Sequence, residues 1–396
     1  MTLTLAGKDE VEMFVLSQIL TRLMTRGTLT VIDPAGKRHV FKGKAAGKSV
    51  TMRIHDRAAL FKMSVYPKLY MGELYMDGRL TIEEGDLYEF LELLILNLDW
   101  STNHRFSWLG DLVQKLIWLA TRYNPRGRSL NNVAHHYDLS DELYELFLDK
   151  NRQYSCGYFK TPEDDIDLAQ VQKMTHIAAK LDLSPDQKVL DIGCGWGGLA
   201  RFIAENSDAH VTGVTLSKNQ LAYAKRLAGE KGLENKVTYS LTDYRDVAEK
   251  FDRVVSVGMF EHVGEPHYME FFAKVKEVMK KDGVALIHTI GAANSPSPIN
   301  PWIDKWIFPG SYLPSLSQMA TVAEKIGLYI TDVEVLRVHY AETLKAWRKR
   351  FNENRDKART IYDERFCRMW DFYLASVEAA FRHGSLIVFQ MQLARR

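Results

Sequence analysis

Cysteine is scarce in this sequence of 396 residues: there are three, Cys156, Cys194 and Cys367, far apart along the chain. An odd number of cysteines without a repeated spacing argues against a disulfide framework and against a zinc cluster. We therefore expect a reducing compartment, the cytoplasm, and no metal site.

A long apolar run is also missing. The longest runs, residues 90–98 and 385–393, are too short to span a bilayer. The first residues lack the positive start and the continuous apolar segment of a signal peptide. If this protein meets lipid, we expect it to do so from the membrane surface.

Neither sign of charge dominates. The chain has 52 lysines and arginines against 50 aspartates and glutamates, a formal net charge of +2. This near balance excludes neither a membrane nor a nucleic acid, because local patches matter more than the sum. The basic segment 345–359 is typical of a solvated helix face, with proximity to anionic headgroups as the alternative.

The length exceeds what one ordinary core accommodates, so it predicts two domains. Residues 1–100 combine apolar-periodic helices with strand-like runs and turn signals, which predicts a small α+β domain. No catalytic cluster stands out there, which favours a structural or dimerising module. As the alternative, the strands followed by YMDGRLTIEEGD and an apolar helix resemble a lipid-binding fold of the sterol-carrier type. Residues 101–128 are amphipathic and aromatic and end with basic residues, and we interpret them as a linker, with a membrane-surface helix as the alternative.

From residue 188 onward, strand and helix patterns alternate. Strands are predicted at 188–193, 210–217, 236–243, 251–260, 283–291, 328–339 and 385–394, and helices at 198–206, 218–232, 266–279 and 316–327. Such alternation builds a parallel sheet with helices on both faces, so residues 129–396 are predicted to form an α/β catalytic domain. The irregular segment 292–315 carries four aromatic residues, and we favour a lid over plain packing for them: Trp302, Trp306, Phe308 and Tyr312.

The most informative motif is VLDIGCGWGG, an apolar strand that ends in a glycine-rich turn. Glycines there let the backbone approach a ligand, and the carboxyl ends of parallel strands are where open α/β sheets bind ligands. A dinucleotide enzyme is the competing interpretation. The spacing G-x-G-x-G and Asp191 just before the turn argue against it, as does the lack of an acid after the next strand. The polar groups available there are Thr215, Ser217 and Gln220.

VLDIGCGWGG resembles motif I of the class I S-adenosylmethionine-dependent methyltransferases. The resemblance implies a Rossmann-like methyltransferase domain, behind the smaller N-terminal α+β domain. It also implies that Gly193 and Gly195 line the methionine part of the cofactor site and that Asp191 supports it. In the segment TDYRD, Asp243 and Tyr244 would lie on the adenine side.

Further segments resemble the cyclopropane fatty acid synthase and mycolic acid cyclopropane synthase family. They are HHYDLSDELYELFLDKNRQYSCGYF, GVTLSKNQLAYAK, VSVGMFEHVG, LIHTIG, FPGSYLPS and RMWDFYLASVEAAFRHGSLIVFQMQLAR, in this order over residues 135–396. The extra leading domain is similar to the bacterial branch that acts on phospholipids. The family implies transfer of a methylene unit from S-adenosylmethionine to the cis double bond of an unsaturated fatty acyl chain in a membrane phospholipid.

The chemistry is consistent with such a site. A double bond attacks the sulfonium methyl without an activated nucleophile, so the site must exclude water, shield a carbocation and remove one proton for ring closure. In the resembling enzymes a bound bicarbonate takes this proton. Its pocket maps onto five residues here: Cys156, Glu261, His288, Ile290 and Tyr340. By the same resemblance Tyr154 and Ser155 contact the cofactor.

The family also implies a membrane as partner, contacted peripherally, and no nucleic acid. It further implies a homodimer formed through the first domain, working from the cytoplasm on the inner face of the membrane. The closest rival function is a sister enzyme that resolves the same cation as a methyl- or methylene-branched chain. Methylation of a small molecule or of a protein, and a non-enzymatic lipid-binding role, also stay open. The sequence leaves undetermined the double-bond position, the headgroup preference and the membrane-facing surface.

Overall fold

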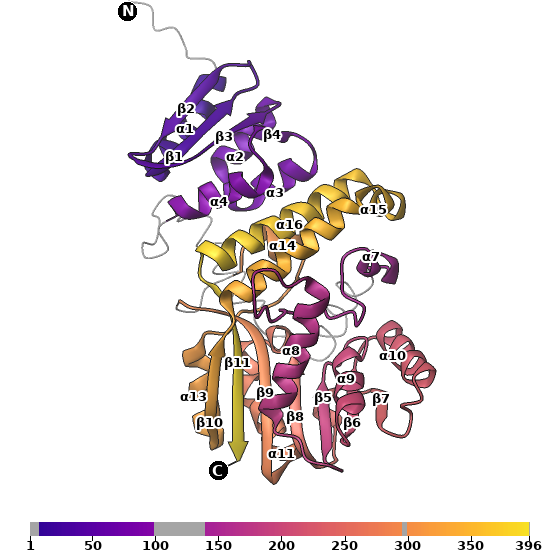
Figure 1. Cartoon of the computed structure of the whole chain (residues 1–396). Coiled ribbons are helices and arrows are strands. Elements are labelled where there is room, and N and C mark those ends of the chain that lie inside the picture. The colour runs from indigo at the N-terminus through magenta and orange to yellow at the C-terminus, as the bar shows by residue number, and fades with distance from the viewer. Residues whose placement is uncertain (1–7, 99–138, 295–298, 396) are drawn as a thin grey trace, which may run out of the picture. The chain divides into compact units, whose positions relative to one another are not determined.

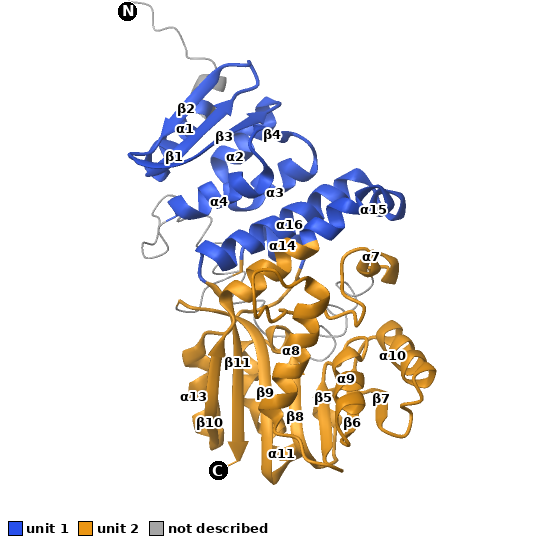
Figure 2. Ribbon diagram, viewed as in Figure 1, with its two compact units in different colours: residues 1–117, 300–307, 348–385 blue, residues 118–299, 308–347, 386–396 orange. Residues whose placement is uncertain are grey.

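The computed structural model describes residues 8–98, 139–294 and 299–395, with side chains from residue 13 onward. These residues form two compact units, coloured separately in Figure 2. Among the described residues, the first unit comprises 8–98, 300–307 and 348–385, and the second comprises the rest. The predicted linker, 101–128, lies outside the described residues, so the expected domain boundaries stay a prediction.

The first unit contains a four-stranded sheet of order β2-β1-β3-β4, in which β1 and β3 are parallel and the other pairs antiparallel. Its elements are α1 (Lys8–Leu23), β1 (Arg26–Ile32), β2 (Arg38–Lys42), β3 (Ala45–Ile54), α2 (Arg57–Val65), α3 (Pro67–Met76), β4 (Leu80–Glu84), α4 (Leu87–Asn97), α12 (Pro301–Trp306), α15 (Arg355–Ile361) and α16 (Glu364–His383). The helix α14 (Arg337–Glu353) is divided between the units, with residues to 347 in the second. This unit is the small α+β domain that the sequence predicts, extended by segments from later in the chain.

The second unit is built on a seven-stranded sheet of order β10-β11-β9-β8-β5-β6-β7 (Figure 1). Its elements are α7 (Asp141–Glu145), α8 (Ile166–Leu181), β5 (Lys188–Ile192), α9 (Gly198–Asn206), β6 (His210–Thr215), α10 (Lys218–Glu230), β7 (Val237–Leu241), β8 (Phe251–Val257), α11 (Tyr268–Val278), β9 (Met279–Ala292), α13 (Leu316–Ile326), β10 (Leu328–Val335) and β11 (Leu386–Arg395). The strands β7, β6, β5, β8 and β9 run parallel, whereas β11 is antiparallel to both β9 and β10.

Helices cover both faces of this sheet, and each face has its own hydrophobic core. One core joins α11 and α13 to the sheet through residues such as Phe271 and Met319. The other joins α8, α9 and α10 to it through Ile177, Ile203 and Ala224. This three-layer arrangement confirms the predicted α/β fold class with a central, mostly parallel sheet.

Two elements differ from the sequence-based expectation. The segment predicted to be irregular contains α12, whose first residue is Pro301 and whose N-cap, Asn300, accepts a hydrogen bond from the backbone N–H of Trp302 (2.9 Å). The strand predicted at 328–339 ends earlier, at Val335, and α14 begins at Arg337. Among the described residues, none of the helices combines the length and the apolar character needed to cross a bilayer.

The four aromatic residues that we interpreted as a lid take different positions. Trp302 is buried within the first unit, with its ring 4.8 Å from that of Phe372. Trp306 also belongs to the first unit, where its indole N–H donates to Glu73 (3.1 Å). Phe308 and Tyr312 belong to the second unit, and Tyr312 is buried against Tyr268. Core packing therefore accounts for Trp302, contrary to the lid interpretation.

Candidate active site

The glycine-rich turn follows β5 and leads into α9. Gly193, Gly195 and Gly197 have φ angles of 77°, 55° and 74°, a region that side chains other than glycine rarely adopt. A Cβ at Gly193 would lie 2.9 Å from the side chain of Met259, whereas one at Gly195 would meet no atom within 4 Å. The turn thus keeps an open space above the end of β5.

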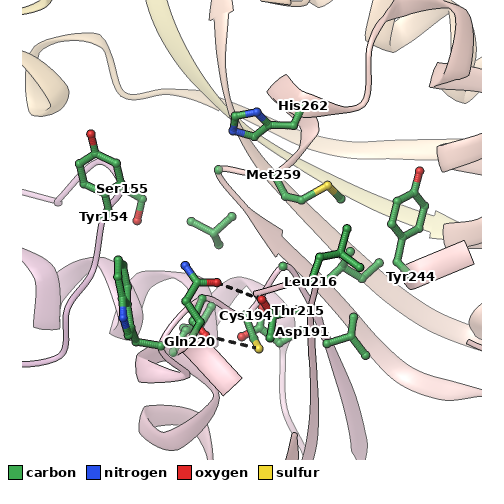
Figure 3. Close-up of a pocket in the computed structure, with 18 of the residues that line it drawn as sticks. Tyr154, Ser155, Asp191, Cys194, Thr215, Leu216, Gln220, Tyr244, Met259 and His262 are labelled. Carbon is green, nitrogen blue, oxygen red and sulfur yellow. Dashed lines mark hydrogen bonds between the residues drawn. The ribbon is translucent and has the colours of Figure 1, made fainter. Parts of the chain in front are cut away.

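That space is a pocket at the carboxyl ends of β5, β6, β7 and β8 (Figure 3). Every predicted cofactor residue except Ser217 lines it, and the labelled side chains surround its centre from several elements. The predicted residues that line it are Tyr154, Ser155, Asp191, Gly193, Gly195, Thr215, Gln220, Asp243 and Tyr244. Their assignment to the cofactor stays a prediction, but the fold does bring them to one cavity.

Asp191 lies at the base of this pocket. Its side chain is 2% exposed, and its Oδ2 has no hydrogen-bond partner among the described residues. Burial raises the pKa of this carboxyl to about 7, and the nearby charge of Lys173 opposes the rise. A buried carboxylate oxygen without a partner suits a cationic or hydrogen-bond-donating ligand.

At the end of β6, two polar side chains of the pocket wall form a hydrogen bond with each other, at the place where a dinucleotide-binding site would have an acidic side chain. The Thr215 hydroxyl donates to Gln220 Oε1 (2.9 Å), and both residues line the pocket. Ser217 instead caps α10, since its hydroxyl oxygen accepts from the backbone N–H of Gln220 (3.3 Å). Helix capping therefore explains why Ser217 is absent from the pocket wall.

Past the end of β7, the pair predicted for the adenine side lies in the pocket wall. Asp243 is paired with Arg245, whose Nη2 lies 2.7 Å from the carboxylate. The ring of Tyr244 packs edge-on against Phe271, with centroids 5.4 Å apart. Asp243 is thus held in place by its own ion pair.

The five residues predicted for the anion lie outside the wall of this pocket, in the same unit. Four of them are buried, and Ile290 is partly exposed. Two of them are joined directly, because Glu261 Oε1 accepts from the backbone N–H of Ile290 (2.6 Å). Glu261 Oε2 is buried without a partner among the described residues. Burial raises the pKa of Glu261 to about 7, while the Ile290 N–H opposes the rise.

The other three predicted anion residues are also buried. The Nδ1 atom of His288 lies 3.2 Å from the amide nitrogen of Gln390, its cross-strand neighbour on β11, and burial lowers the pKa of His288 to about 3. The Cys156 thiol contacts the carbonyl oxygens of Gly157 (3.2 Å) and Leu336 (3.8 Å), and burial raises its pKa. Tyr340 lies on α14 with its ring 6.0 Å from that of Trp347. Convergence of all five on one ion stays a prediction.

Several pocket residues were missed in the sequence. Arg152, Trp196 and Met259 all line the pocket. His262 lines it too; its sequence position is equally consistent with capping a helix and with a site role, and burial lowers its pKa to about 4. Arg152 has a φ angle of 49° and its guanidinium lies 3.9 Å from the ring centroid of Tyr223. In the sequence, only their positions could have identified them as pocket residues, because they follow predicted strand ends or lie in or next to the recognised motifs.

Comparison with known proteins supports one family. The model of the mycolic acid cyclopropane synthetase family matches residues 125–391. The cyclopropane-fatty-acyl-phospholipid synthase of Escherichia coli (strain K12) is 39% identical over 329 residues, which cover 83% of each chain. The tuberculostearic acid methyltransferase of Mycobacterium tuberculosis (strain ATCC 25618 / H37Rv) is 33% identical over 395 residues, covering 96% of this chain and 90% of the relative.

Solved structures agree with the sequence matches. The cyclopropane synthase MmaA2 from Mycobacterium tuberculosis is 33% identical, with a TM-score of 0.64, and covers 69% of this chain and 99% of its own. The mycolic acid cyclopropane synthase CmaA1, complexed with SAH and CTAB, gives the same TM-score of 0.64 and identity of 33%, covering 68% of this chain and 99% of its own. The predicted class, an S-adenosylmethionine-dependent methyltransferase, is confirmed by these matches. The pocket at the glycine-rich turn after β5 is consistent with these matches. Because the family model matches residues 125–391 and the E. coli relative is 39% identical, the chain belongs to the mycolic acid cyclopropane synthetase family.

Proposed function

We propose that this protein transfers a methylene unit from S-adenosylmethionine to the cis double bond of an unsaturated fatty acyl chain in a membrane phospholipid, forming a cyclopropane ring. The observation that carries the proposal is the identity of 39% with the E. coli cyclopropane-fatty-acyl-phospholipid synthase over 83% of both chains. The pocket fits the sulfonium substrate, because an unpartnered carboxylate oxygen of Asp191 lies at its base and the turn glycines leave the space open.

The part of the protein in this reaction is mainly to exclude water and hold the reactants. A carbon–carbon double bond needs no deprotonation before it attacks a methyl group, so no activated nucleophile is required. The pocket wall is largely apolar near the end of β8, where Val257, Met259 and Val263 line it. Such a wall keeps water from the cationic centre and strengthens each fixed dipole around it.

The second part of the proposal concerns bicarbonate. The five residues that would hold it are Cys156, Glu261, His288, Ile290 and Tyr340. The fit rests on Glu261, which is buried, has one unpartnered oxygen and a pKa near 7, and can therefore give or take a hydrogen-bonding proton near neutral pH. Bicarbonate, when bound, would supply a base for the proton that ring closure releases.

We further propose that the protein is a homodimer through its first domain and is a peripheral membrane protein on the cytoplasmic face. Two apolar side chains on α2, Phe61 and Val65, are exposed, and Lys62 lies beside them in the sequence. Apolar residues flanked by a basic one are typical of a surface that contacts anionic lipid. These features support the assignment of residues 1–100 to lipid binding or dimerisation.

A second candidate function is formation of a methyl- or methylene-branched acyl chain from the same cation. It is favoured by the match to the tuberculostearic acid methyltransferase, which covers 96% of this chain. A ring, a methylene branch and a methyl branch that keeps a double bond differ only in the position from which the cation loses its proton, so the pocket described above serves all three. A saturated methyl branch would in addition require a hydride donor, such as a reduced nicotinamide cofactor.

The test is to incubate the protein with labelled S-adenosylmethionine and vesicles whose phospholipids carry oleoyl chains, then to analyse the acyl chains by mass spectrometry and NMR. A methylene-bridged chain is expected, together with cofactor turnover that falls when bicarbonate is removed. A branched chain would select the second candidate, and turnover without any acyl product would reject both. Turnover that does not depend on bicarbonate would reject the proposed base alone.

A further inference from the structure

A short strip of chain, residues 153–157, separates the cofactor pocket from the predicted anion residues. Gln153 and Ser155 line the pocket, and the next residue, Cys156, belongs to the predicted anion set. The side-chain amide of Gln170 on α8 donates to the carbonyl oxygens of Ser155 (2.8 Å) and Gln153 (3.3 Å). The strip is therefore fixed by hydrogen bonds from α8.

Lys173 lies one helical turn after Gln170 and is 0% exposed. Its ammonium group donates to the Ser155 hydroxyl (3.0 Å) and to Gln153 Oε1. Among the residues that the structure describes, no carboxylate forms a direct ion pair with it, although an ammonium group is costly to bury without one. A lysine in this setting is poorly explained by stability alone.

We propose that Lys173 is a positioning residue of the methyl-transfer site: it fixes Gln153 and Ser155 in the pocket wall and keeps the carboxylate of Asp191 charged for a sulfonium ligand. This inference rests on the proposed function only in using the same pocket. It assigns a role to a buried charge that touches neither the proposed anion residues nor the reacting atoms.

The electrostatics support this role. Burial alone would favour the neutral form of Asp191, and the charge of Lys173 opposes that effect. Burial also lowers the pKa of Lys173, to about 8, while Asp149, Cys156 and Asp191 counteract the drop. Each charge therefore favours the charge on the other group near neutral pH.

Other titratable groups surround the pair. The Asp149 carboxylate favours the charged form of Lys173, and the Arg201 guanidinium acts on Cys194 and Tyr239. On the side of Asp191, the pKa values of Cys194 and Tyr239 are both raised by burial. On the side of Lys173, burial lowers the pKa of His288, and the charge of Lys173 lowers it further. Because Glu261 and the amino group of S-adenosylmethionine also titrate between about pH 6 and about pH 9, only the difference between the profiles of a Lys173 variant and the wild type is assigned to Asp191 and Lys173.

The experiment measures binding of S-adenosylmethionine to the full chain by calorimetry, without lipid, from about pH 6 to about pH 9. Wild-type affinity is expected to rise through about pH 7 and to fall above about pH 8, as Asp191 ionises and Lys173 then loses its proton. For K173M we expect affinity about 100-fold lower near neutral pH, with the rise displaced to higher pH and the alkaline fall abolished. K173R keeps its proton at every pH tested, so it should retain the rise and lose only the alkaline fall.

The matched control is K180M, two turns further along α8, where the lysine pairs with Asp332 (2.9 Å) and Glu334 (2.6 Å). Its binding profile is expected to follow that of the wild type. The proposal is overturned if K173M binds with the wild-type pH profile, or if K173M and K173R lose affinity equally without a change in profile. If K173M does not fold, K173R decides alone. The proposal is then overturned if the affinity of K173R falls at alkaline pH in the same way as that of the wild type. A failure of the proposed function would be seen separately, because the protein would still bind S-adenosylmethionine but would form a different acyl product from vesicles.

Discussion

Replacing Asp191 by asparagine is expected to stabilise the ligand-free protein at higher pH while weakening its site. Burial raises the pKa of this carboxyl from 3.8 to about 7. An acid with a higher pKa in the folded state than in the unfolded chain costs stability as pH rises between the two values, because the unfolded chain releases the proton first. Asparagine has a similar shape and no proton to release, so Asp191→Asn lacks this cost.

The size of the effect follows from the two pKa values. Moving the carboxyl pKa from 3.8 to about 7 corresponds to about 4 kcal/mol when both states are ionised, at about 1.36 kcal/mol for each pH unit. Between about pH 5 and about pH 8, the integrated difference is about 2.5 kcal/mol. Other shifted groups, such as Glu261 and His262, titrate in both proteins. The variant minus wild-type difference therefore reports the Asp191 carboxyl together with Lys173, whose pKa the Asp191 charge raises.

The assay is hydrogen exchange of the β5 backbone, which reports opening of the second unit separately from the first. The free energy of opening for Asp191→Asn relative to the wild type should increase from about pH 5 to about pH 7 and level off above that. In parallel, S-adenosylmethionine should bind the variant about 10- to 100-fold more weakly at about pH 8, since a charged hydrogen-bond acceptor is lost. A stability difference that stays constant with pH would refute the reasoning, because Asp191 would then ionise as an exposed group does.

Three further predictions address other parts of the molecule. Glu261→Gln should lower turnover about 100-fold, because the amide cannot take a proton. Binding of S-adenosylmethionine, measured by calorimetry, should be unchanged. A loss of this binding would assign Glu261 to the cofactor site instead. Phe61→Ser, at a side chain that is 54% exposed, should reduce co-sedimentation of the protein with anionic vesicles. Val40→Ser, at a side chain that is 63% exposed in the same unit, should not reduce it. An equal loss of co-sedimentation in both variants would argue against a local contact at Phe61. Gly193→Ala should abolish cofactor binding, since the added Cβ would lie 2.9 Å from a neighbouring side chain at a φ of 77°. The control Gly232→Ala, at a φ of 65° with open space around it, should only destabilise the fold, by about 1 kcal/mol. Intact cofactor binding in Gly193→Ala would contradict the close approach.

Local patterns sufficed for much of the catalytic unit. The strand 188–192 and the helix 198–206 were predicted within a residue, because an apolar run, a glycine turn and an amphipathic helix follow one another directly. The same segment located Asp191 and the turn glycines that line the pocket. The motif resemblance, rather than periodicity, brought Tyr154 and Asp243 into the candidate site.

Features that depend on distant segments could not be predicted in this way. The burial of Trp302 results from packing on Phe372, which lies 70 positions later in the chain, so the aromatic loop gave no local sign of it. Lys173 has the sequence signature of a solvated helix face, and only the tertiary structure shows that it is enclosed. In contrast, a signal for α12 was present in Asn300-Pro301, a cap followed by a proline at the first helical position.

The place of β11 between β9 and β10 has a consequence for how the protein acquires its activity. During synthesis on the ribosome, the sheet cannot close until residues 386–395 emerge, because this strand fills an interior gap rather than extending an edge. Until then β9, which carries His288 and Ile290, has an unpaired side and His288 lacks its neighbour Gln390. This strand, made after both of its neighbours, therefore completes the region that holds two of the predicted proton-handling residues, and contacts this distant in sequence are slow to form.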